Sequence, residues 1–191
     1  YNSSQQVLIY PAPNIDFNAN KYSGCLPLTV NFTDLSKDLE VVDPITGTIY
    51  KSKISSRQWT FGDGSIKTTD VDNTTYTYTK SGTRAVSLNV IYEGGCAAFK
   101  QSPQNYISIF PQPLSSFYMP AANTCQYPVT VQANNNSTNA VQYKWSVQGP
   151  PGSSISSDTD PSPIFSFQQS GIYKIKLIAI SKDGCTHESS L

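Results

Sequence analysis

The one side-chain pair in this sequence that could form a nucleophilic site is Cys185 with His187, the only histidine. A Cys–His site requires a free thiol and a base positioned to activate it. The sequence contains no HExxH motif, no phosphate-binding loop and no Ser-His-Asp set. The other cysteines are Cys25, Cys96 and Cys125, and none is spaced as in a CxxC metal site. An even number of widely spaced cysteines predicts two disulfides in an oxidising compartment, the alternative being four buried free thiols in a cytosolic protein.

The aspartates of the chain are candidate Ca²⁺ ligands, because Ca²⁺ prefers several oxygen ligands. The candidate ligands lie in two groups: Asp63, Asp70 and Asp72, and nearer the first strands Asp16, Asp34 and Asp38. None has EF-hand spacing, and Asp63 is better explained as a turn residue. We therefore assign no Ca²⁺ ligand set and expect no other cofactor.

Charge and composition exclude several classes of protein. The 191 residues carry 13 basic and 13 acidic side chains, so there is no basic excess to neutralise nucleic-acid phosphates. No apolar run approaches the roughly 20 residues that span a bilayer, which predicts no membrane insertion. β-Branched and aromatic residues, with 13 prolines and 11 glycines, favour an all-β fold.

An internal repeat organises these elements. Val7-Leu8-Ile9-Tyr10 followed by Pro-Ala-Pro returns 100 residues later as Ile107-Ser108-Ile109-Phe110 followed by Pro-Gln-Pro. Further ordered matches pair Cys25 with Cys125, Trp59 with Trp145, Ser81-Gly82-Thr83 with Ser170-Gly171-Ile172, and Cys96 with Cys185. Ordered matches of this kind indicate two copies of one structural unit.

Each copy has the pattern of a β-sandwich, with short strands separated by turns. The expected strands are Ile15–Ala19, Leu28–Leu35, Arg57–Phe61, Thr75–Tyr78, Ala85–Tyr92, Tyr106–Phe110 and, in the second copy, Ile172–Ile180. In Ala85–Tyr92, alternation predicts a buried face made by Val86, Leu88, Val90 and Tyr92.

The stretch Trp59-Thr60-Phe61-Gly62-Asp63-Gly64 resembles the hallmark strand and turn of the PKD (polycystic kidney disease) domain family. Tyr76, Tyr78, Gly82 and Val86 fit the motif that follows it, and Pro27–Ser36 matches the family's opening segment. In the second copy Trp145 is followed by Ser146-Val147-Gln148-Gly149, without Gly-Asp-Gly, so its turn must be built differently.

The resemblance implies two tandem immunoglobulin-like sandwiches. We expect residues 1–10 to be the closing strand of a preceding repeat, residues 11–111 to be one PKD domain, and residues 112–191 to be a divergent PKD-like domain that lacks its closing strand. The repeat predicts the disulfides Cys25–Cys96 and Cys125–Cys185. The Gly-Cys positions are similar to PKD repeats of large secreted surface proteins of gliding bacteria, including adhesins exported by the type IX route.

The first copy contains an insertion, Lys37–Ser55, with the pattern of a β-hairpin. Its candidate binding residues are Val41, Asp43, Ile45, Thr48 and Tyr50, the alternative being a hairpin that only packs on its own domain. The resulting expectation is a non-enzymatic, extracellular spacer or adhesion module. Its partners would be neighbouring repeats, a glycan or a cell-surface component. The rival is a substrate-engaging accessory domain of a secreted polysaccharide- or collagen-degrading enzyme.

Overall fold

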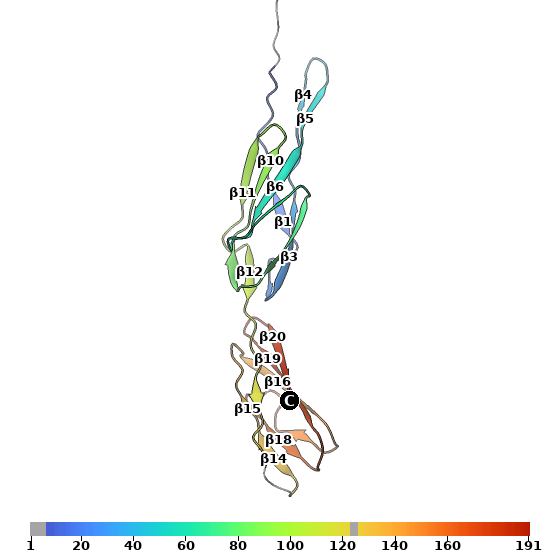
Figure 1. Cartoon of the computed structure of the whole chain (residues 1–191), viewed down its shortest axis with the longest axis vertical. Coiled ribbons are helices and arrows are strands. Elements are labelled where there is room, and N and C mark those ends of the chain that lie inside the picture. Colours follow the sequence, from blue (N-terminus) through green and yellow to red (C-terminus); the bar gives the residue numbers. More distant parts are fainter. Residues whose placement is uncertain (1–6, 123–125) are drawn as a thin grey trace, which may run out of the picture. The chain divides into compact units, whose positions relative to one another are not determined.

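The computed structural model describes residues 7–122 and 126–191, and all regular structure in this part of the chain is β-strand. The predicted all-β class is confirmed. The chain divides into unit 1, Tyr1–Ile109, and unit 2, Phe110–Leu191 (Figure 1). No helix in the described residues is long and apolar enough to cross a membrane.

Unit 1 is a sandwich built from antiparallel sheets (Figure 1). One layer contains β1, β3 and β8, the opposite layer has the order β11-β10-β6-β7, and β12 pairs between β2 and β9. The strands are β1 (Phe17–Ala19), β2 (Ser23–Cys25), β3 (Leu28–Asp34), β4 (Leu39–Val42), β5 (Ile49–Ser52), β6 (Ile54–Thr60), β7 (Ile66–Thr69), β8 (Asn73–Tyr78), β9 (Gly82–Arg84), β10 (Ser87–Tyr92), β11 (Ala97–Gln101) and β12 (Ile107–Phe110).

Alternation along the strands produces the core of unit 1. On β3, Leu28, Val30 and Phe32 are buried while the residues between them face outward. The predicted buried face of Val86, Leu88, Val90 and Tyr92 is confirmed. Trp59 lies opposite Leu88 on β10 and is fully buried among these side chains. Its ring meets Phe17 from the other layer edge to face, with centroids 5.3 Å apart, so the tryptophan joins the two layers.

Unit 2 repeats this pairing around a smaller core. Its sheets have the orders β13-β15, β14-β18-β17 and β16-β19-β20. Trp145 lies opposite Leu177, as Trp59 lies opposite Leu88, and both residues are buried. The strands are β13 (Phe117–Tyr118), β14 (Val129–Gln132), β15 (Asn134–Asn135), β16 (Gln142–Gln148), β17 (Ser154–Ile155), β18 (Ile164–Phe167), β19 (Lys174–Ile180) and β20 (Thr186–Ser190).

One predicted strand of unit 2 begins later than its sequence pattern indicates. The alternation predicts a strand from Ile172, whereas β19 begins at Lys174. Ile172 is 92% exposed and lies outside the strand. The apolar residue type alone therefore misplaced the start of the strand.

Candidate functional site

The Trp59–Gly64 segment is structural at every position. Trp59 and Phe61 are fully buried, and the chain then turns through Gly62 and Gly64 with φ values of +79° and +93°. A Cβ on Gly62 would lie 2.3 Å from the Ala85 carbonyl oxygen, whereas one on Gly64 would meet open space. Only Gly62 therefore combines a left-handed backbone with a close backbone approach.

Asp63 serves this turn. One carboxylate oxygen accepts a hydrogen bond from the Ser65 amide at 3.0 Å and the other from the Tyr76 hydroxyl at 2.7 Å. Burial by itself raises the pKa of Asp63, but these hydrogen bonds outweigh it and hold the pKa below its usual value. Asp63 thus accepts one hydrogen bond from its own turn and one from β8, in agreement with the turn-residue interpretation.

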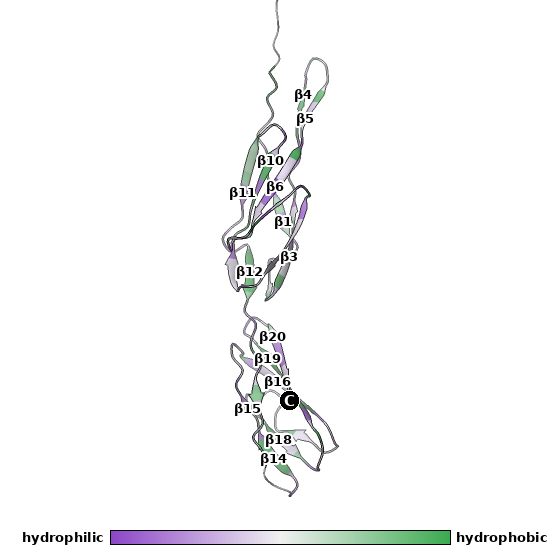
Figure 2. Ribbon diagram, viewed as in Figure 1, coloured by the Kyte–Doolittle hydropathy of each residue, from purple (hydrophilic) through white to green (hydrophobic). Residues whose placement is uncertain are grey.

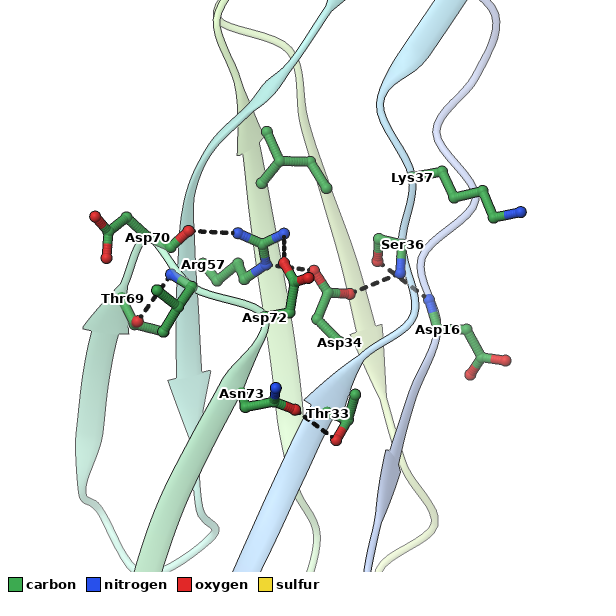
Figure 3. A network of polar contacts seen from close by, with 12 residues as sticks. Asp16, Thr33, Asp34, Ser36, Lys37, Arg57, Thr69, Asp70, Asp72 and Asn73 are labelled. Carbon is green, nitrogen blue, oxygen red and sulfur yellow. Dashed lines mark hydrogen bonds and ion pairs between the residues drawn. The ribbon is translucent and has the colours of Figure 1, made fainter.

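Two of the other candidate carboxylates, those of Asp34 and Asp72, and the backbone carbonyl of Asp70 meet at a buried arginine that the sequence analysis did not single out (Figure 3). Arg57 comes from β6, and its Nε donates to Asp34 Oδ2 at 2.6 Å. Its Nη1 donates to the Asp70 carbonyl oxygen at 2.9 Å, and its Nη2 pairs with Asp72 Oδ1. Only 7% of the Arg57 side chain and none of the Asp34 side chain is exposed. The Arg57 side chain therefore joins its own strand, β6, to β3 and to the loop between β7 and β8.

The remaining two acidic candidates also have partners. Lys100 Nζ lies 2.8 Å from Asp16 Oδ1, and this hydrogen bond lowers the pKa of Asp16. Asp38 Oδ1 accepts from the Ile54 amide at 2.9 Å. Among the described residues, no group of three or more Asp, Glu, His or Cys side chains is placed to hold a metal ion. Of the candidate carboxylates, Asp16, Asp34 and Asp72 form ion pairs, and Asp38 and Asp63 accept hydrogen bonds from backbone amides.

A polar hollow of about 640 Å³ opens beside Arg57 and Asp72. Its other lining residues are Ser36, Lys37, Asp38 and Glu40 on the way into the hairpin and Ile54 at the start of β6. Its lining therefore presents both ammonium and carboxylate groups, and it could donate and accept hydrogen bonds to a polar ligand.

The predicted hairpin is confirmed as an antiparallel pair of β4 and β5, with Val41 opposite Tyr50. It extends beyond the sheets of unit 1 (Figure 1). At its turn, Asp43 Oδ1 accepts from the Ile45 amide at 2.8 Å and Gly47 has a φ of +72°. Ile45 at this turn is 93% exposed. The sequence-predicted binding residues therefore lie on one projecting element, and their binding role stays a prediction.

The cysteines differ from the predicted pairing. Cys25 and Cys185 are disulfide-bonded, whereas Cys96 is an exposed free thiol. The predicted Cys25–Cys96 bridge is therefore wrong, because Cys96 is a free, exposed thiol. Cys125, the predicted partner of Cys185, lies outside the described residues.

Cys185 is disulfide-bonded, as the repeat predicted, and is therefore not available as a nucleophile beside His187. The sulfur of Cys185 is committed to a disulfide and cannot form a thiolate. His187 Nδ1 accepts a hydrogen bond from the Ser115 amide at 3.0 Å.

In unit 2 the indole of Trp145 donates to the Asp160 carbonyl at 2.9 Å, so this tryptophan too is a core residue.

Comparison with known proteins locates the family in unit 1. The family model described as PKD domain matches residues 12–105, and no curated protein matches the chain. A similar solved structure concerns the promiscuous specificity of carbohydrate-binding modules of the β-sandwich superfamily, at 18% identity and a TM-score of 0.43. That alignment covers 89% of this chain and 55% of the other, so the chain spans about half of that relative.

A second similar structure contains the fibronectin(III)-like modules of Clostridium thermocellum CbhA, at 15% identity and a TM-score of 0.34. It covers 92% of this chain and 91% of that chain. The family model, the Trp59–Gly64 strand and turn, and the two-layer sandwich agree over the same residues. Residues 12–105 of unit 1 therefore match the family model described as PKD domain.

Proposed function

We propose that this chain is a non-enzymatic, extracellular segment of a large bacterial surface protein of the gliding-adhesin kind, where it acts as a spacer and adhesion module. The β4–β5 hairpin is its contact surface in this proposal. The observation that carries it is an apolar turn held away from the sandwich on an anchored base.

The anchoring comes from hydrogen bonds at the foot of the hairpin. Tyr92, on β10, donates its hydroxyl to the Lys37 carbonyl at 3.1 Å. Asp38 holds the Ile54 amide at 2.9 Å, and the Gly94 amide donates to Ser52 Oγ at 3.4 Å. These bonds join both ends of the insertion to the sheet of unit 1. A fixed base positions the turn without further ordering cost on binding.

The projecting part of the hairpin carries the apolar side chains Val42, Ile45 and Ile49, all exposed. Figure 2 shows hydrophobic residues on this element beside polar ones. A hollow of about 370 Å³ lies against it, lined by Val41, Pro44 and Tyr50 and by residues 7–9. Contiguous exposed apolar surface of this kind marks interaction sites more often than single exposed residues do.

The extracellular setting is supported by two features of the chain. A PKD domain and disulfide-bonded cysteines are both typical of domains outside the cell. A disulfide persists there because no thiol pool reduces it.

The second candidate is an accessory domain that engages the polymeric substrate of a secreted hydrolase. The polar hollow beside Arg57 favours it, because hydroxyl-rich chains need many donors and acceptors. Binding of the chain to chitin, cellulose or collagen that is lost on Lys37→Ala, with Lys80→Ala as control, would favour this candidate over the first.

The adhesion proposal is tested by shortening the hairpin. Because Val41 and Tyr50 are cross-strand partners, an Asn-Gly turn can join them directly. A second variant, Ile45→Lys, keeps the backbone intact. Both are expected to weaken adsorption to isolated bacterial envelopes by about tenfold or more, while Ile66→Lys, at an exposed position on β7, leaves it unchanged. Equal adsorption of all four proteins would overturn the proposal.

A further inference from the structure

The outer face of the β3–β8 pair in unit 1 carries only asparagine and threonine. On β3 the residues Leu28, Val30 and Phe32 are buried, and those between them point away from the core. On β8 the same alternation buries Thr74 and Tyr78. The outward residues pair across the two strands as Thr29 with Thr77, Asn31 with Thr75, and Thr33 with Asn73. None of these six side chains is charged, and together they form a neutral surface that we call the Asn/Thr face.

Each of the three pairs is joined by a hydrogen bond between its side chains. In the first pair the two threonine hydroxyls lie 2.9 Å apart. In the other two, a threonine hydroxyl donates to an asparagine Oδ1, from Thr75 to Asn31 at 2.8 Å and from Thr33 to Asn73 at 2.8 Å. The Thr33–Asn73 bond is drawn in Figure 3. Side chains held in this way lose little further freedom when a ligand binds.

The two asparagines keep their amide nitrogens available. Asn31 and Asn73 are both exposed, and each uses its Oδ1 in the cross-strand bond. In the part of the chain that the structure describes, neither Nδ2 amino group makes a hydrogen bond. Each amino group has two N–H donors, and each threonine oxygen keeps an acceptor lone pair. The Asn/Thr face therefore presents fixed donors and acceptors side by side.

Unit 2 shows that the sandwich does not require this arrangement. There β14 pairs with β18 as β3 pairs with β8. Gln132 is the equivalent of Asn31, but it lies opposite Ile164, which is 47% exposed. The Gln132 side chain donates instead to the Ser162 carbonyl at 3.3 Å. The row of amide–hydroxyl pairs is thus a property of unit 1 and not of the fold.

The chemistry of the Asn/Thr face distinguishes among classes of ligand. Because its six side chains carry no charge, it offers no counter-charge to phosphates or to acidic glycans. Because its only apolar groups are threonine methyls, an apolar partner would bury little surface on it. Sugar hydroxyls both donate and accept hydrogen bonds, so they match amide donors that alternate with hydroxyl acceptors.

We propose that the Asn/Thr face binds an extended neutral polysaccharide. Its hydroxyl groups accept hydrogen bonds from Asn31 and Asn73 and donate to the threonine oxygens. Outward residues on one strand are about 7 Å apart, so successive pairs contact successive parts of the polymer. The face shares no residue with the hairpin turn or with the polar hollow beside Arg57, so this proposal does not rest on either function proposed above.

The experiment is affinity electrophoresis of the full chain in native gels that contain hydroxyethyl cellulose, galactomannan or dextran. We expect at least one of these neutral polymers to retard the protein. The double variant Asn31→Thr, Asn73→Thr removes the amide donors and leaves threonine opposite threonine, as in the Thr29–Thr77 pair. It is expected to keep the unfolding midpoint and to weaken binding about tenfold or more. Thr75→Val, which keeps a β-branched side chain, is a second variant expected to weaken binding.

The matched control is Asn89→Thr, at an outward position on β10 in the opposite layer, where Asn89 lies opposite Gln58. This variant is expected to bind as the parent does. Ile45→Lys and Lys37→Ala are also expected to leave the retardation unchanged, which separates this site from the hairpin and the hollow. The proposal is overturned if none of the three neutral polymers retards the parent, if only polygalacturonate does, or if the double asparagine variant is retarded as strongly as the parent.

Discussion

Removing Asp34 should expose how much unit 1 depends on its buried ion pair. In Asp34→Ala, the Arg57 guanidinium keeps Asp72 and the Asp70 carbonyl but loses its one fully buried counter-charge. Loss of one partner from a buried pair costs about 3–5 kcal/mol. Because Asp72 remains, we expect the lower end, about 3 kcal/mol. Asp72→Ala should cost about 1 kcal/mol or less, since the Asp72 side chain is 66% exposed.

Differential scanning calorimetry of the full chain measures both variants. In a domain of 60–100 residues each kcal/mol shifts the midpoint by roughly 4–8 °C, so Asp34→Ala should lower the transition of unit 1 by about 12–24 °C. The transition of unit 2 is the internal control. Adding Arg57→Met to Asp34→Ala should recover part of the loss, because the uncompensated charge is then gone. If Asp34→Ala costs no more than Asp72→Ala, burial does not set the strength of this pair and the reasoning is refuted.

Three further outcomes are expected. Gly62→Ala should destabilise unit 1 by at least about 1 kcal/mol more than Gly64→Ala in urea unfolding, because both have a positive φ but only Gly62 abuts the Ala85 carbonyl; equal losses would contradict this. Burial raises the pKa of Tyr78, so the stability it contributes is complete below pH about 10, where unfolded tyrosines ionise, and declines above it. Tyr78→Phe should make that alkaline decline shallower, and an unchanged pH profile of the unfolding midpoint would refute the assignment. Peptide mapping after maleimide treatment without reductant should find Cys96 modified, and protection of Cys96 would show that it is bonded.

The β4–β5 hairpin shows which features the local sequence can predict and which depend on the folded domain. Val41–Tyr50 has strand residues on both sides of Asp-Pro and Thr-Gly, so its turn and pairing could be predicted from neighbouring residues alone. The anchoring of its base could not, because Tyr92 is distant in the sequence and reaches Lys37 only in the folded sandwich. The sequence could thus predict the hairpin itself, but not the hydrogen bonds that fix its base to unit 1.

By itself the sequence determined the all-β class, the buried faces of the strands and the structural role of Trp59 and Trp145, because side-chain alternation and turn chemistry act between near neighbours. Tertiary structure decided that Arg57 gathers Asp34 and Asp72, and that Cys96 stays a free thiol while Cys25 is disulfide-bonded. The physical reason is common to both. Ion pairs and disulfides join residues that are far apart in the sequence, and which of these residues become neighbours depends on how the sheets pack.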